Sequence, residues 1–203
     1  MKYKWINSNN SGELIVFFNG WGMDESVVKH LNYNNYDVLM IYDYNNLDTD
    51  FDFSKLNKYS KKHLVAWSMG VMIATKFNIS YDSATAINGT LAPIDNNYGI
   101  PTRIYDLTIK NYNEFGAKKF IKNMFNEDIE LPKCNRKFEN QKTELSAIKA
   151  YKANENFKYN RVIISNNDKI IPTKNQCNYW EIDANIESGH CPFFNFKTWE
   201  ELL

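Results

Sequence analysis

The setting of Ser68 is the strongest indication of chemistry in this chain of 203 residues. It lies in Ala66-Trp67-Ser68-Met69-Gly70, between an apolar run at 64–67 and a helix-like stretch at 71–74. A serine at this junction stands on a sharp, strained turn that exposes its hydroxyl at the carboxyl end of a sheet. The usual pattern is Gly-x-Ser-x-Gly, and Ala66 replaces the first glycine. We interpret Ser68 as a nucleophile, with a buried structural serine as the alternative.

A serine hydroxyl is a weak nucleophile, so it needs an adjacent base, and that base needs an orienting group. His190 and Asp168 both follow predicted strands, and the order Ser68, Asp168, His190 is that of α/β-hydrolases. His190 would take the serine proton, and Asp168 would hold the imidazole in the required tautomer. Asp95 and Asp106 follow an earlier predicted strand and stay open as alternatives for the acid.

A nucleophilic serine also needs hydrogen-bond donors for the negative charge that develops on the substrate oxygen. One expected donor is the backbone N–H of Met69, directly after the serine. The loop after the first predicted strand should supply the other, because Gly20 and Gly22 let it turn sharply and leave the N–H of Trp21 free. Residues that we expect around the substrate are Trp67, Gly20, Asn88 and Gly89.

The elements that must position these residues alternate between strand and helix, which predicts a mostly parallel sheet. Sites in such sheets lie beyond the carboxyl ends of the strands, where all the candidates above fall. We predict a compact α/β fold whose sheet is flanked by helices, with a final helix at 196–203. The expected strands are 13–18, 37–42, 63–67, 83–87, 161–165 and 180–186.

Residues 107–153 carry no strand pattern and have apolar residues at helical spacing. We therefore divide the chain into a core, 1–106 with 154–203, and a small helical cap, 107–153. The formal charge of the whole chain is zero, which argues against general nucleic-acid binding. Residues 110–161, however, contain 12 basic and 7 acidic side chains.

The cysteines and the hydropathy limit the class of protein further. Three widely spaced cysteines predict neither a disulfide framework nor a metal site, and we expect no cofactor. The N-terminus lacks a signal peptide pattern, and no apolar run reaches about 18 residues, the length of a membrane span. We expect a cytoplasmic monomer with no nucleic-acid or membrane partner.

Several motifs together resemble the BioG-type methyl ester carboxylesterases of biotin synthesis. The resemblance rests on Phe17-Phe18-Asn19-Gly20-Trp21-Gly22-Met23-Asp24, the segment around Ser68, Ala86-Ile87-Asn88-Gly89-Thr90, Pro93-Ile94-Asp95 with Gly99-Ile100-Pro101, and Ser188-Gly189-His190-Cys191-Pro192-Phe193. It covers nearly the whole chain. It implies an α/β-hydrolase with a helical cap that cleaves the methyl ester of pimeloyl-acyl-carrier protein.

The substrate carrier of that family is a small acidic protein, and a basic cap would attract it. The candidate contacts are Lys118, Lys119, Lys122, Lys133, Arg136, Lys137, Lys142 and Lys149. A solvated charged face is the alternative interpretation of these residues. The catalytic motifs do not separate this ester from another acyl ester or a thioester, and a non-catalytic binding module is a further alternative.

Overall fold

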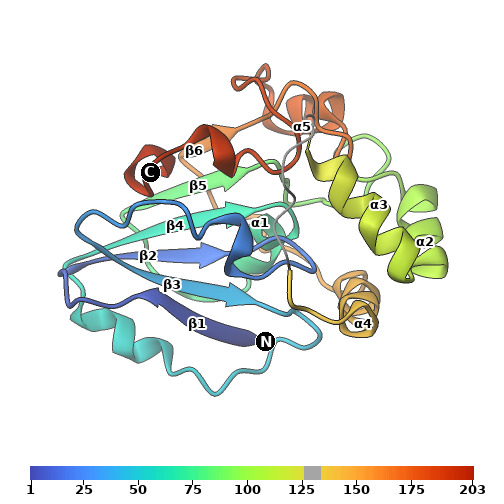
Figure 1. Cartoon of the computed structure of the whole chain (residues 1–203). Coiled ribbons are helices and arrows are strands. Elements are labelled where there is room, and N and C mark those ends of the chain that lie inside the picture. Colours follow the sequence, from blue (N-terminus) through green and yellow to red (C-terminus); the bar gives the residue numbers. More distant parts are fainter. Residues whose placement is uncertain (126–133) are drawn as a thin grey trace.

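A six-stranded sheet forms the centre of the protein in the computed structural model, which describes residues 1–125 and 134–203 (Figure 1). The strand order is β1-β3-β2-β4-β5-β6, and all neighbouring pairs are parallel except β1 with β3. The strands are β1 (Lys2–Asn7), β2 (Glu13–Phe18), β3 (Tyr36–Tyr42), β4 (Lys61–Trp67), β5 (Ser83–Ile87) and β6 (Arg161–Ile163).

The central strands are apolar at consecutive positions because both faces of the sheet are covered. On β2, Leu14, Val16 and Phe18 join one buried cluster, whereas Ile15 and Phe17 join another on the opposite face. All five side chains are fully buried. This two-sided core fixes the register of the strands and therefore the positions at which they end.

Helices lie behind the sheet and beyond the carboxyl ends of its strands. Helix α1 follows β4 directly, whereas α2, α3 and α4 stand together at the end toward which the parallel strands point (Figure 1). The helices are α1 (Met69–Ala74), α2 (Thr102–Asn111), α3 (Glu114–Met124), α4 (Phe138–Ile148) and α5 (Thr173–Trp180). The short 3₁₀ helices are η1 (Glu25–Val27), η2 (Phe53–Lys58), η3 (Phe193–Asn195) and η4 (Glu200–Leu202).

The predicted α/β fold, a mostly parallel sheet flanked by helices, is confirmed, while several element predictions need correction. Five predicted strands are present, but 180–186 is not a strand: α5 continues to Trp180, and only Ile186 forms an isolated bridge, with Ser165. The sequence pattern also missed β1, a half-exposed edge strand. A single 3₁₀ turn, η4, lies where the final helix was predicted.

The segment predicted as a cap contains α3, α4 and the second half of α2. Helix α2 begins at Thr102, so the predicted boundary at 107 falls inside it. Within 1–125 and 134–203, no helix has the length and apolar character needed to cross a membrane.

Candidate active site

Ser68 stands on a strained turn between β4 and α1. Its backbone has φ +57° and ψ −124°, a conformation that disfavours a residue with a side chain. The turn is tight because strand and helix pass close together: a Cβ on Gly70 would lie 2.3 Å from the carbonyl oxygen of Phe18. Only glycine fits there, which explains the Ser-x-Gly spacing. Ala66, at the position of the missing glycine, is fully buried in the sheet.

His190 connects the Ser68 hydroxyl to a carboxylate. Its Nε2 lies 2.9 Å from Ser68 Oγ, and its Nδ1 lies 2.7 Å from Asp168 Oδ2. Ser68 follows β4, Asp168 lies in the loop after β6, and His190 lies in the loop before η3. All three are buried, with exposed fractions of 4% for Ser68, 1% for His190 and 7% for Asp168. The structure therefore brings together the three residues predicted from the sequence in one hydrogen-bonded row.

The Asp168 carboxylate is held by its own loop and by α5. Oδ1 accepts hydrogen bonds from the N–H groups of Ile170 and Ile171, at 2.8 and 3.0 Å. Oδ2 accepts one from Gln176 Nε2 at 2.8 Å, in addition to His190. These donors fix the orientation of the carboxylate toward His190. Gln176 carried no signal in the sequence, because its role depends on the packing of α5.

The alternative acids lie elsewhere. Asp95 accepts hydrogen bonds from the N–H groups of Asn97 and Tyr98 within its own loop. Asp106 is about half-exposed on α2 and pairs with Lys149. Of the remaining histidines, His30 bonds to the carbonyl of Phe193, and His63 lies at the start of β4, at the amino end of the sheet. The geometry therefore favours Asp168 and His190.

The backbone N–H groups of Trp21 and Met69 make no hydrogen bond among the described residues. Met69 is the first residue of α1, where N–H groups have no partner within the helix. Trp21 lies in the loop after β2, which packs so closely that a Cβ on Gly20 would lie 2.7 Å from the ring of Trp67. Trp21 and Met69 both line the cavity beside the serine.

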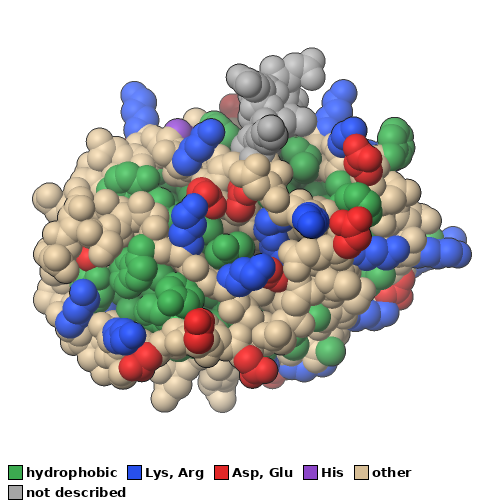
Figure 2. Space-filling view, turned by 60° about the horizontal axis from the view of Figure 1, so that its bottom comes forward, with side chains coloured by type: hydrophobic (Ala, Val, Ile, Leu, Met, Phe, Trp, Pro, Cys, Tyr) green, Lys and Arg blue, Asp and Glu red, His purple; other side chains and the backbone are tan. Residues whose placement is uncertain are grey.

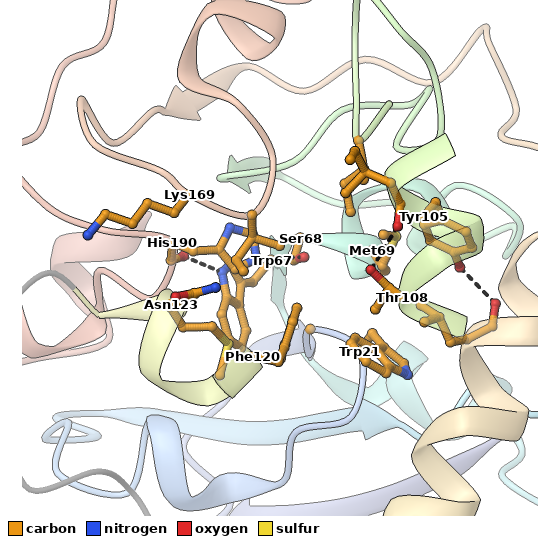
Figure 3. A pocket seen from close by; sticks show the side chains of 16 residues that line it. Trp21, Trp67, Ser68, Met69, Tyr105, Thr108, Phe120, Asn123, Lys169 and His190 are labelled. Atoms are coloured by element: carbon orange, nitrogen blue, oxygen red, sulfur yellow. Dashed lines mark hydrogen bonds between the residues drawn. The ribbon is translucent and has the colours of Figure 1, made fainter. Parts of the chain in front are cut away.

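The cavity in front of Ser68 is largely apolar. Figure 3 shows Ser68 and His190 together on one side and Tyr105 and Thr108 of α2 on the other. The residues lining it are Gly20, Trp21, Trp67, Ser68, Met69, Ile100, Ile104, Tyr105, Thr108, Phe120, Asn123, Met124, Leu145, Lys169, Ile170 and His190. The lining residues from α2, α3 and α4 were not predicted individually, because their helical spacing indicates only a buried face.

Asn88 and Gly89, which we expected around the substrate, do not line this cavity. Asn88 is buried and ties the histidine loop to the sheet: its Nδ2 lies 3.0 Å from the carbonyl of His190 and 2.8 Å from Ser165 Oγ. A Cβ on Gly89 would lie 2.4 Å from the Ser68 carbonyl. Trp67 lines the cavity and also donates from Nε1 to the His190 carbonyl at 2.8 Å.

The residues predicted as basic contacts differ in their exposure. Lysines 118, 119, 122, 137 and 149 are exposed and Lys142 is half-buried, whereas Lys133 lies outside the described residues. Basic side chains project from the side of the molecule that carries α2, α3 and α4, interspersed with acidic ones (Figure 2). Arg136 is not a surface contact, since its side chain is 7% exposed and pairs with the buried Asp43 and Glu144.

Comparisons with known proteins agree with this architecture. Residues 1–202 match the model of a family described as "Pimeloyl-ACP methyl esterase BioG". The crystal structure of BioG from Haemophilus influenzae is 34% identical, with a TM-score of 0.90 over 100% of this chain and 99% of that one.

Two further proteins are similar over large parts of this chain. A malonyl-[acyl-carrier protein] O-methyltransferase from Bacteroides fragilis is 38% identical over 83% of this chain, which corresponds to 36% of the Bacteroides protein. A putative aryl esterase from Burkholderia cenocepacia is 12% identical, with a TM-score of 0.66 over 95% of this chain and 88% of that one. The latter likeness concerns the fold alone.

Proposed function

Because this chain belongs to the BioG family of pimeloyl-ACP methyl esterases and is a carboxylic ester hydrolase, we propose that it hydrolyses pimeloyl-[acyl-carrier protein] methyl ester. The products are pimeloyl-[acyl-carrier protein] and methanol, in biotin synthesis. The observation that carries the proposal is the row of hydrogen bonds from Ser68 through His190 to Asp168 at an apolar cavity. The description of the matched family supports the choice of this ester.

The first half of the reaction forms an acyl-enzyme. Ser68 Oγ attacks the ester carbonyl carbon while His190 Nε2 takes the hydroxyl proton, and Asp168 stabilises the imidazolium that results. The carbonyl oxygen becomes negatively charged and accepts hydrogen bonds from the N–H groups of Trp21 and Met69. The bond between the carbonyl carbon and the methoxy oxygen then breaks, and methanol leaves with the proton from His190.

The second half returns the free enzyme. A water molecule gives a proton to His190 Nε2 and attacks the carbonyl carbon of the acyl-serine. The tetrahedral intermediate collapses, the bond to Ser68 Oγ breaks, and His190 returns its proton to that oxygen. Pimeloyl-[acyl-carrier protein] leaves with a free distal carboxylic acid, which loses its remaining proton to solvent.

The methyl ester is at the far end of the acyl chain from the carrier, so the chain must cross the cavity. The apolar side chains between Ser68 and the outer helices suit a run of methylene groups. Ile104 lines the cavity and is 52% exposed, so the cavity opens to the surface at α2. The carrier would then dock over α2 and α3.

The charge of α3 supports this docking site. Lys119 and Lys122 are exposed and form no ion pair within the described residues, whereas Lys118 pairs with Glu114. The same helix supplies Phe120 and Asn123 to the cavity. An acidic carrier attracted to these lysines would therefore deliver its acyl chain close to the opening.

The Bacteroides relative supports a carrier-bound methyl ester as the substrate. That protein is named for O-methylation of malonyl-[acyl-carrier protein], and a segment similar to this chain makes up about a third of it. Methylation of a carboxylate forms a methyl ester, which is the bond that a methyl esterase cleaves. A segment similar to a methyl esterase, in the same protein as such a methyltransferase, would remove that methyl ester at a later stage.

The proposal is tested by mass spectrometry of the carrier protein after incubation with the enzyme. Methyl ester hydrolysis leaves the acyl chain attached and removes one CH₂ unit from the carrier's mass. Thioester hydrolysis would instead release the carrier with a free thiol, and that product would exclude the proposed reaction. Ser68→Ala is the matched control and should leave the substrate intact.

A further inference from the structure

Helix α4 is hydrogen-bonded to the loop after β2, which carries the Trp21 N–H proposed as an oxyanion donor. The N–H of Gly22 donates to Glu144 Oε2 at 3.2 Å, and Gln141 Nε2 donates to the carbonyl of Gly22 at 2.8 Å. Both backbone groups of one glycine, which has φ +75°, are thus held by side chains of a distant helix. The chemistry described above uses neither side chain.

Further contacts make this attachment continuous on both sides of the turn. The Trp21 indole N–H donates to the backbone carbonyl of Gln141 at 2.7 Å. Glu144 Oε1 accepts from the N–H of Tyr44 at 2.7 Å, and the Tyr44 hydroxyl donates to the Asn19 carbonyl at 2.8 Å. Helix α4 therefore holds the loop at its centre directly and at its start through Tyr44.

The charge of Glu144 is unusual for a core position. The side chain is fully buried and pairs with Arg136 at 2.8 Å, and Arg136 also pairs with Asp43 at 3.2 Å. Burial raises the pKa of Glu144, and the Arg136 guanidinium opposes that effect. An apolar side chain of the same size often stabilises a core equally well. A buried carboxyl group that accepts two backbone N–H groups, those of Gly22 and Tyr44, holds both of these backbone segments in place.

The turn sets the direction of the Trp21 N–H. The carbonyl of Gly20 accepts a hydrogen bond from the N–H of Met23 at 3.3 Å. In a planar trans peptide, the N–H of Trp21 points opposite to that carbonyl. Rotation of the Gly20–Trp21 peptide plane would therefore change the direction in which the Trp21 N–H points. The bonds to Gly22, the next residue, restrict such a rotation.

We propose that Glu144 and Gln141 are positioning residues that hold the turn at 20–23 so that the Trp21 N–H faces the oxyanion of the tetrahedral intermediate. This inference rests on the proposed function, because it presumes that Ser68 is acylated. It assigns to α4 a part in the rate of the chemical step, in addition to its contribution to the cavity wall.

The test compares Gln141→Met and Glu144→Gln with the parent on a short p-nitrophenyl ester. Gln141→Met keeps the length of the side chain and the backbone carbonyl that Trp21 uses. A misdirected oxyanion donor should lower kcat about 10- to 100-fold and change KM little, because the hydrogen bond strengthens only in the transition state. An alkyl boronic acid, which forms a tetrahedral adduct with the serine, should bind more weakly by a similar factor.

Ile148→Val is the matched control, since Ile148 is fully buried on the same helix and does not line the cavity. The inference is supported if both variants lose more kcat and more boronate affinity than Ile148→Val does, at a similar loss of melting temperature. Unchanged values in Gln141→Met, or losses that merely follow the melting temperature, overturn it. If Glu144→Gln does not fold, Gln141→Met decides. Failure of the proposed function gives a different result, because the parent would then leave the methyl ester of the carrier-bound substrate intact.

Discussion

The two sides of the cavity are built on different principles. On the sheet side, Ser68, Asp168 and His190 each occupy a turn next to a strand or a short helix, and backbone geometry places them. On the helical side, α2, α3 and α4 contribute side chains that reach the cavity or the loop after β2. The first side depends on the strand ends, and the second on how three helices pack.

This difference separates bond breaking from recognition and alignment. The sheet side is anchored in a core with both faces buried, so its geometry is costly to deform. The helical side has fewer buried residues and more exposed charges. We therefore expect changes on the sheet side to abolish turnover, and changes on the helical side to produce graded effects.

The largest expected effect on the sheet side is that of Ser68→Ala. Loss of the nucleophile should lower kcat by about 10⁴- to 10⁶-fold. The fold should persist, because alanine fits the same space and, among the residues the structure describes, the hydroxyl bonds to His190 alone. Ester hydrolysis and circular dichroism of the purified variant measure both outcomes. Residual activity within tenfold of the parent would show that the nucleophile is another residue.

Asp168→Asn comes next and tests the choice of acid. An amide in place of the carboxylate favours the wrong tautomer of His190, which should lower kcat about 10⁴-fold. Asp95→Asn and Asp106→Asn are the matched controls, because these carboxylates serve their own loop or pair with Lys149. Steady-state kinetics on a short ester decides between them. A large loss in either control variant would move the acid away from the loop after β6.

A smaller effect is expected on the helical side from Lys119→Glu with Lys122→Glu. Reversal of these exposed charges should lower kcat/KM for the carrier-bound ester several-fold at low salt, and the loss should shrink as ionic strength rises. A free p-nitrophenyl ester should react at an unchanged rate, because it has no carrier.

The matched control for this charge reversal is Lys55→Glu with Lys58→Glu. These lysines belong to η2, on the opposite side of the molecule from α3 (Figure 1). An equal loss on both substrates in the α3 variant would indicate damage to the cavity. An equal loss for both pairs of lysines on the carrier substrate would exclude a localised docking site.

The smallest expected effect concerns Asp24, which lies in the loop after β2 and contacts the segment before α4. Burial alone would raise its pKa, but hydrogen bonds from Ser26 and from the N–H of Asn135 lower it below the usual value. A lowered pKa adds stability above about pH 4, and that stability is lost as pH falls through the pKa of the folded protein. Asp24→Asn should therefore cost about 1 kcal/mol at pH 7 and less at pH 3, because it removes the charge that the hydrogen bonds stabilise. Urea denaturation at both pH values measures the difference, and an equal cost at both would contradict the charged role.

Much of the sheet side was predictable because local sequence determines it. The apolar runs on β2 to β5 identify buried strands, and the spacing of Ser68 and Gly70 identifies the turn between β4 and α1. The chain order of Ser68, Asp168 and His190 then suggested partners that the structure brings within hydrogen-bond distance. These signals are short-range: a strand, a turn and the residue types in the loops.

The remaining features depend on packing between distant segments. The exposed residues of β1 gave a weak pattern, and pairing with β3 makes that segment a strand. The run 180–186 looked like a strand because Trp180, Ile182 and Ile186 suit one. Helix α5, however, ends at Trp180, and the rest forms a loop in which Ile186 makes an isolated bridge with Ser165.

The sequence by itself determined the turn at Ser68, the parallel strands and the order of the groups at their ends, because each depends on a few adjacent residues. Only the tertiary structure decided that Arg136 is buried and that Glu144 and Gln141 hold Gly22. The physical reason is that the burial of a charge depends on partners far along the chain. For Arg136 and Glu144, Asp43 and the loop after β2 provide those partners.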